Sequence, residues 1–192
     1  MTFLLKFSTI YMVIYMKKEN KNKTDKEHIY KDSLRELIPY ALVIIVVVLI
    51  RTFIATPIKV NGTSMMTTLE HGDTMILNKI GMKFDDIKRF QIVVIKTDDS
   101  YLIKRVIGLP GETVEYKDEK LYINGKEIKD PYYKDNTLDF DKVKIPKEHY
   151  YVMGDNRSNS IDSRILGTIP KKDIMGTTKL VIFPFSNFGI AK

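Results

Sequence analysis

An almost unbroken run of leucine, isoleucine, valine and alanine over residues 37–50 restricts what this chain can fold into more than any other feature. Residues 53–55 continue the run beyond Arg51, whose long side chain can reach an interface, so the apolar stretch approaches the ~20 residues that cross a bilayer. A strand or helix buried in a protein core is the alternative, but such elements are usually shorter. The sequence therefore predicts one transmembrane helix over residues 37–58.

The segments before this helix differ in character. Residues 17–36 are rich in lysine and lack an apolar period. Because basic segments close to a span stay in the cytoplasm, we predict that residues 17–36 are cytoplasmic, that residues 59–192 lie outside the cell membrane, and that membrane lipid is a partner. Residues 1–16 are apolar but short. They are interpreted as a marginal first span, an unusual leader, or an upstream extension of the reading frame with Met16 as the true start.

Length and composition narrow the classes for the remainder. The chain has 192 residues, no cysteine and a formal net charge of +7. One domain of ~150 residues beside the anchor is the expectation. Without cysteine there is neither a disulfide framework nor a thiolate metal site. The positive charge suits nucleic acid, anionic lipid or no specific partner, because net charge governs association and not fold.

Residues 59–192 have the pattern of an antiparallel β-domain. Short β-prone runs occur at residues 72–78, 90–95, 101–108, 150–153 and 179–183. Asn124-Gly125 between alternating residues is a strong hairpin signal. We read residues 113–149 as a small β insertion, with 135–147 irregular. Its tyrosines lie among acidic residues, which disfavours nucleic-acid binding.

Ser64 is the candidate nucleophile, in the stretch Val60-Asn61-Gly62-Thr63-Ser64-Met65. A serine needs a base, oxyanion donors and a backbone that presents it, and Gly62 permits a tight turn just before it. The alternative is a polar turn that joins a membrane helix to a domain.

Lys104 is the candidate base. Successive strand residues point to opposite faces, so Lys104 and Arg105 cannot both face solvent on a flat sheet, and if Arg105 is outside then Lys104 points inward. Burial disfavours the charged amine and lowers its pKa, so that it can take a proton from a serine. A snorkelling lysine on an edge strand is the alternative. His28, His71 and His149 are isolated, show neither a triad nor a metal-ligand pattern, and are read as surface residues.

Residues 154–164 form a polar loop with two acids, two arginines and three serines. Charge-assisted hydrogen bonds can make such a loop rigid, and we expect an Asp-Arg pair to fix it while a serine hydroxyl orients the amine. A solvated turn is the alternative reading.

Together these blocks resemble a bacterial type I signal peptidase of the single-span kind found in Gram-positive organisms. The resemblance covers residues 37–183 and rests on the membrane segment followed, in order, by Gly62-Thr63-Ser64-Met65, Lys104-Arg105-Val106-Ile107-Gly108-Leu109-Pro110-Gly111-Glu112, and Gly154-Asp155-Asn156-Arg157 with Ser160, Asp162, Ser163 and Arg164.

The resemblance implies a mainly β fold of coiled antiparallel sheets after one transmembrane helix, and a membrane-anchored serine endopeptidase without cofactor or metal. Its substrates would be secretory precursors whose signal peptides carry small residues at the first and third positions before the cut. It assigns Ser64 as nucleophile and Lys104 as general base, and it places the oxyanion at the Ser64 N–H and at the position of Gly62, where relatives with serine supply a hydroxyl. The supporting residues would be Ser160, Asp162, Arg164, Asp155, Arg157 and Met65.

Two positions depart from the family pattern. Thr67 stands where relatives usually have proline, and Leu102 stands where many have an aromatic residue. Both bear on efficiency more than on reaction type. Two other functions remain open from the residues alone: a self-cleaving repressor-type Ser-Lys protease, which predicts a DNA-binding helical domain, and a non-catalytic membrane-anchored binding module.

Overall fold

The computed structural model describes residue 12 and residues 35–49, 51, 55–79, 81, 86–98, 100–132 and 137–191. The chain divides into two compact units, residues 1–49 and residues 50–192. The predicted apolar leader (1–16) and basic segment (17–36) lie outside the described residues, apart from residues 12, 35 and 36.

The described part of the first unit is a helix over residues 35–49. Its large apolar side chains between Leu37 and Leu49 are each at least 44% exposed, and they lie all around the helix. Across the described residues, we find no helix with both the length and the apolar character needed to cross a membrane.

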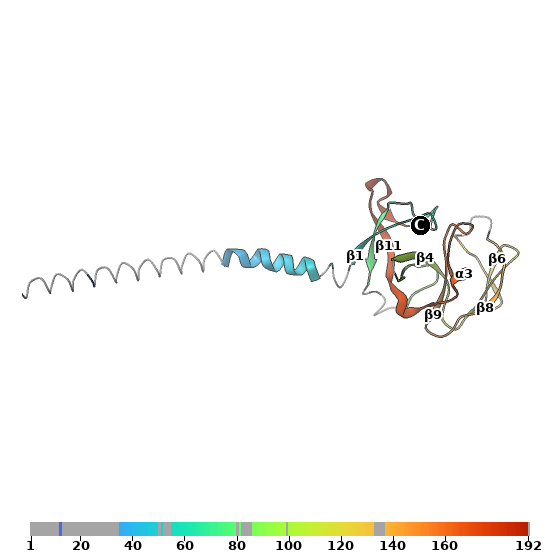
Figure 1. The fold of residues 1–192 in the computed structure, drawn as a ribbon. Helices are drawn as coiled ribbons and strands as arrows, with labels where there is room; N and C mark the ends of the chain where they lie inside the picture. Colours follow the sequence, from blue (N-terminus) through green and yellow to red (C-terminus); the bar gives the residue numbers. More distant parts are fainter. Residues whose placement is uncertain are drawn as a thin grey trace, which may run out of the picture. The chain divides into compact units, whose positions relative to one another are not determined.

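The second unit is built mainly of antiparallel β-strands (Figure 1). Eight strands of the described residues form the larger sheet, in the order β1-β2-β11-β3-β4-β9-β10, with β12 beside β11. Their bounds are β1 Ala55–Lys59, β2 Thr74–Asn78, β3 Ile92–Lys96, β4 Tyr101–Gly108, β9 His149–Met153, β10 Ile169–Pro170, β11 Ile174–Phe183 and β12 Gly189–Ile190. Short helical turns, α3 Ser163–Leu166, η2 Lys171–Asp173 and η3 Phe185–Asn187, connect or follow them.

A smaller sheet has the order β7-β6-β5-β8. Its strands are β5 Thr113–Lys117, β6 Lys120–Ile123, β7 Lys126–Ile128 and β8 Phe140–Lys144. In Figure 1, β6 and β8 lie at one end of this unit and β1 lies at the other. Asn124 and Gly125 join β6 to β7 with φ angles of 51° and 79°, as a two-residue hairpin turn requires.

Apolar side chains are buried on both faces of the larger sheet. In β3, Ile92 and Val94 join one apolar cluster, while Val93 and Ile95 join a second cluster on the opposite face. This continuous burial explains why β3 reads as an uninterrupted apolar run. A third cluster, which includes Ile107, packs the smaller sheet against β4 and β9.

Three sequence predictions differ from the structure. Residues 55–58, assigned to the transmembrane helix, belong to β1, where they pair with residues 75–78 of β2 and where Pro57 would interrupt a helix. Residues 140–144 were read as irregular but form β8, which pairs with β5 through Val143 and Val114. The final strand is also longer than expected, because β11 begins at Ile174.

Candidate active site

Apolar side chains anchor the turn that carries Ser64 in the core. Met65 and Leu69, on either side of a helical turn, are buried in the first apolar cluster. The N–H of Leu69 donates to the Met65 carbonyl at 2.9 Å. Gly62 has a φ of 97°, a conformation that favours glycine. These contacts leave the Ser64 side chain half-buried at the surface of the core.

Lys104 extends from β4 to meet this serine. Its Nζ lies 2.6 Å from Ser64 Oγ, a hydrogen-bond distance between residues 40 positions apart. The Lys104 side chain is only 2% exposed. The structure therefore brings together the predicted nucleophile and base, as the inward orientation of Lys104 suggested.

Burial lowers the pKa of the Lys104 amine below its ordinary value of 10.5. The carboxylates of Asp162 and Asp155 act in the opposite direction, and the Arg164 guanidinium adds to the lowering. Because desolvation dominates, the neutral amine is favoured more than in a free lysine. A neutral amine beside a hydroxyl is the state in which a lysine accepts a proton.

The Asp162 carboxylate organises the loop next to Lys104. Burial alone would raise the pKa of Asp162, but hydrogen bonds from Arg164 and from the Gly154 N–H hold it below its usual value. Arg164 donates to both carboxylate oxygens at 2.9 and 2.8 Å. The Ser160 hydroxyl is buried near this carboxylate and also lowers the pKa of Asp162. The expected Asp162–Arg164 pair is therefore present.

Gly154 lets the loop approach the nucleophile closely. A Cβ at this position would lie 2.5 Å from the carbonyl oxygen of Ser64 and would overlap the Ser160 side chain. The backbone N–H of Asn156 donates to that same carbonyl at 3.0 Å. Its side-chain amide donates to the Thr63 carbonyl at 3.1 Å, and Asn159 donates to the Thr63 hydroxyl at 3.0 Å. The loop thus holds the serine turn through three hydrogen bonds.

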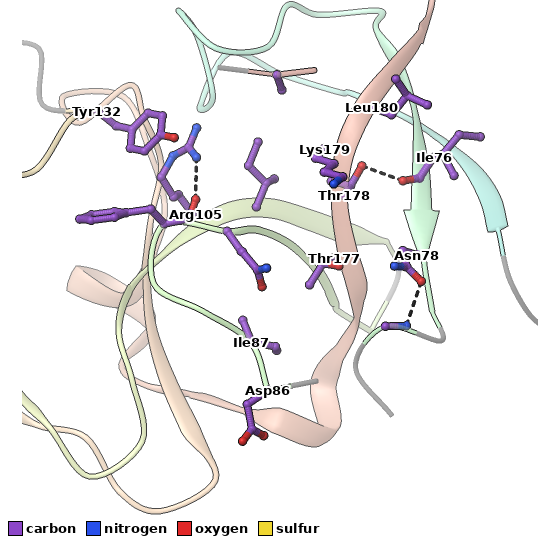
Figure 2. A pocket seen from close by; sticks show the side chains of 15 residues that line it. Ile76, Asn78, Asp86, Ile87, Arg105, Tyr132, Thr177, Thr178, Lys179 and Leu180 are labelled. Atoms are coloured by element: carbon purple, nitrogen blue, oxygen red, sulfur yellow. Dashed lines mark hydrogen bonds between the residues drawn. The ribbon is translucent and has the colours of Figure 1, made fainter. Parts of the chain in front are cut away.

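Arg105 does not face solvent either, because it is 2% exposed like its neighbour Lys104. Its guanidinium donates to both oxygens of Asp155, at 2.8 and 2.6 Å, and to the Phe90 carbonyl. The guanidinium also stacks on the Tyr132 ring at 3.3 Å (Figure 2). These partners compensate the charge, so an arginine can occupy the interior.

Asp155 and Arg157, two further residues of this loop, do not pair with each other. Asp155 is paired with Arg105, and Arg157 donates instead to Asp130 at 2.6 Å. Arg157 also donates to the Gly154 carbonyl, so it ties the smaller sheet's segment to the loop beside the dyad. Burial raises the pKa of Tyr116, another partner of Arg157, to about 12.

The N–H of Gly62 donates to Nδ1 of His71 at 3.1 Å. The histidine is exposed, as predicted, but it contacts the nucleophile turn. The Ser64 N–H makes no hydrogen bond within the described part of the chain. Of the two predicted oxyanion positions, Ser64 therefore has the free backbone donor.

Two hollows lie near these residues. A small recess is lined by residues 60–62, 64–65 and 101–104, directly at the dyad. A cavity of about 630 Å³ lies between β2, β3 and β11, with Arg105 and Tyr132 on one wall and Thr178 on another (Figure 2). Neither Ser64 nor Lys104 lines this larger cavity. The described residues include no group of three or more acidic or histidine side chains that would hold a metal ion.

Comparison with known proteins identifies the family. A family model described as signal peptidase, peptidase S26, matches residues 34–183. This chain belongs to that family. The chain is 42% identical over 181 residues to signal peptidase I of Bacillus amyloliquefaciens, a match that covers 88% of this chain and 96% of the relative. The sequence-based recognition of a type I signal peptidase is confirmed, and with it the expectation of a hydrolase.

Two further proteins are similar to this chain. Signal peptidase I S of Bacillus subtilis is 41% identical over 184 residues, which covers 89% of this chain and 97% of the relative. A crystal structure of a signal peptidase I from Enterococcus faecalis is 34% identical, covers 48% of this chain and 97% of that chain, and has a TM-score of 0.44.

Several residues of the site were missed from the sequence. Asn156 and Asn159 hold the serine turn, and Asp130 and Tyr132 hold the two buried arginines. Only the density of polar residues in the 154–164 loop hinted at the asparagines. Asp130 and Tyr132 gave no signal, because nothing in their own segment shows that it folds back against the loop.

Proposed function

We propose that this chain is a membrane-anchored serine endopeptidase that removes signal peptides from secretory precursors, with Ser64 as nucleophile and Lys104 as general base. The observation that carries the proposal is the 2.6 Å approach of the buried Lys104 Nζ to Ser64 Oγ. Family membership supports the reaction type and the substrate class.

In the first half-reaction, Ser64 Oγ attacks the scissile carbonyl carbon while neutral Lys104 accepts the hydroxyl proton. A tetrahedral intermediate forms and then collapses, the bond to the leaving amine breaks, and Lys104 returns the proton to that amine. In the second half-reaction, water attacks the acyl-serine, Lys104 accepts the water proton, and Ser64 regains its own. These steps use only water and groups of the chain.

The oxyanion is best served by the Ser64 N–H, which is not engaged elsewhere within the described residues. The Gly62 N–H already donates to His71, so it can serve as a second donor only after it leaves that acceptor. Glycine has no hydroxyl to offer in its place. Asp162, Arg164, Gly154 and Ser160 act on Lys104 through position and charge and do not touch the reacting atoms.

A substrate in extended conformation fits the free edges of β1 and β4. Residues 60–62, which directly follow β1, and residues 101–104 of β4 line the recess at Ser64 and Lys104. Addition of a peptide as a strand supplies main-chain hydrogen bonds, and the small volume of the recess favours small side chains beside the cut. This agrees with the small residues that the family resemblance implies.

We further propose that the apolar segment from residue 37 onward anchors the chain in the membrane, with the lysine-rich residues before it in the cytoplasm and the peptidase unit outside. The support is the apolar surface of the helix over residues 35–49, exposed all around, which suits lipid better than water. The basic composition of residues 17–36 supports the orientation.

The test is processing of a secretory precursor by the full chain in detergent. We expect Ser64→Ala and Lys104→Ala each to reduce processing to background, because either change removes a group required for acyl transfer. Lys117→Ala, at an exposed position in β5, is the matched control and retains full activity. Undiminished processing by folded Ser64→Ala or Lys104→Ala would refute the dyad.

A further inference from the structure

The outer edge of β1 offers very few groups for pairing. Backbone groups in an antiparallel strand alternate between its two sides. The Val60 N–H donates to Asp73 and the Val60 carbonyl accepts from Gly72, so Val60 faces β2. Residues 57, 59 and 61 therefore direct their backbone groups to the free side.

Two of these three positions are not available to an incoming strand. Pro57 has no N–H to donate. At Lys59, both groups are occupied by one side chain: the Lys59 N–H donates to the Tyr101 hydroxyl at 3.1 Å, and that hydroxyl donates to the Lys59 carbonyl at 2.6 Å. Of the three, Asn61 has both an N–H and a carbonyl that make no hydrogen bond within the described residues.

The opposite edge belongs to β4. The Val106 N–H donates to Gln91 on the β3 side, so by the same alternation Arg105, Ile103 and Tyr101 face away from β3. Arg105 pairs with Met153 of β9, but β9 ends its pairing there. Ile103 and Tyr101 thus border the recess, facing β1 across what we call the strand gap, the space between residues 57–61 and residues 101–103.

The Tyr101 hydroxyl crosses this gap and imitates a neighbouring strand. One oxygen accepts from the N–H and donates to the carbonyl of a single residue, which is the pair of bonds that a strand residue would make with Lys59. The Tyr101 ring packs on the first apolar cluster, so the hydroxyl is held in place by the core.

We propose that Tyr101 is a specificity-determining residue that closes one end of the strand gap. An extended substrate pairs with Asn61 and Ile103 beside Ser64, and its pairing with β1 stops at Lys59 because the Tyr101 hydroxyl occupies that position. The enzyme therefore recognises a short segment around the scissile bond, and further extended residues on the closed side do not raise kcat/KM. The inference rests on the proposed function, since it concerns the substrate of the same site.

The test compares peptide substrates of different length in the wild type and in Tyr101→Phe, which keeps the ring and removes the hydroxyl. One short peptide spans the scissile bond, and two series lengthen it on the N-terminal or on the C-terminal side. In Tyr101→Phe, Lys59 is free to pair, and two new hydrogen bonds raise kcat/KM for the longer peptides of one series by about fivefold to twentyfold over the short peptide. In the wild type, the ratio stays near one.

Tyr122→Phe is the matched control, because it removes one hydroxyl from a half-buried tyrosine in the smaller sheet. It keeps the wild-type length dependence. If kcat/KM in Tyr101→Phe increases with peptide length in only one series, the result supports the proposal that Tyr101 closes one end of the strand gap. The series that responds also shows in which direction the substrate runs. Equal length dependence in wild type and Tyr101→Phe overturns it. The short peptide distinguishes failure of the proposed function from failure of the Tyr101 proposal. If the wild type cleaves none of the peptides, the proposed function itself is refuted.

Hydrogen exchange at the Lys59 amide is an independent readout that does not depend on turnover. The amide exchanges at least several-fold faster in Tyr101→Phe than in the wild type, because its acceptor is lost at an exposed position. In Ser64→Ala/Tyr101→Phe, saturation with a long peptide of the responsive series slows that exchange again, whereas in Ser64→Ala alone the peptide leaves it unchanged. Identical exchange in wild type and Tyr101→Phe would also contradict the inference.

Discussion

Substitution of Asp155 by asparagine tests how the arginine beside the catalytic lysine is tolerated in the interior. The Arg105 and Asp155 side chains are each 2% exposed and are joined by two hydrogen bonds of 2.8 and 2.6 Å. Asp155→Asn keeps the shape and removes the negative charge, so Arg105 remains buried without a counter-charge, beside a carbonyl, a threonine hydroxyl, the Tyr132 ring and the one remaining side-chain oxygen of residue 155.

The magnitude follows from the burial of this pair. Removal of one partner from a buried ion pair costs about 3–5 kcal/mol, because the other charge stays uncompensated. Asparagine can still accept one hydrogen bond, so we expect about 3 kcal/mol. For a unit of this size, that loss lowers the Tm by about 6–12 °C.

The assay is urea unfolding of the full chain in detergent, followed by near-ultraviolet circular dichroism of the tyrosines, since the chain has no tryptophan. Glu127→Gln is the control. It breaks the Lys120–Glu127 pair, whose side chains are 52% and 55% exposed, and it costs less than about 1 kcal/mol. If Asp155→Asn and Glu127→Gln lose the same small free energy of unfolding, the buried pair does not hold this part of the site.

Three further outcomes follow from the geometry. Gly154→Ala reduces precursor processing at least tenfold and lowers the free energy of unfolding by about 1–3 kcal/mol, because its Cβ overlaps Ser160 and the Ser64 carbonyl; unchanged kinetics would contradict this contact. Lys104→Met abolishes processing but stabilises the fold by roughly 1 kcal/mol at neutral pH, measured by urea unfolding. That advantage shrinks as the pH rises from the lowered pKa of Lys104 toward 10.5, because only in this range does the unfolded wild type bind more protons than the folded one. Asn159→Ala, which removes the hydrogen bond to the Thr63 hydroxyl, lowers kcat about fivefold with little change in KM, and an unchanged kcat would show that the bond does not position Ser64.

Local patterns predicted the elements of the fold well where one residue sets the geometry. Asn124-Gly125 forms the expected turn, and the apolar run at residues 92–95 forms a strand buried on both faces. The pattern failed at residues 55–58, where the apolar character continued beyond the helix into β1. Pro57 was the local sign that a helix does not continue there, because proline is disfavoured in a helix interior.

The reaction centre was predicted from the alternation of strand side chains and from the family motifs, which placed Lys104 inward beside Ser64. The alternation alone did not show that Arg105 is buried as well, because Tyr132 covers its face and Asp155 supplies the counter-charge from distant parts of the sequence. The contacts of Asn156 and Asn159 with Thr63 span more than ninety residues of sequence. Such contacts depend on how distant loops meet, which periodicity does not encode.

The pKa of Lys104 in the working enzyme tests the account most directly. It is obtained from the rate at which an acylating reagent labels Ser64 as a function of pH, with Lys104→Ala as the reference. The account predicts a rate that rises with pH as the amine loses its proton, with a midpoint below the ordinary lysine value of 10.5, and a slow rate without that step in Lys104→Ala. A midpoint at 10.5, or the same pH profile in Lys104→Ala, would contradict a buried neutral lysine that acts as the base.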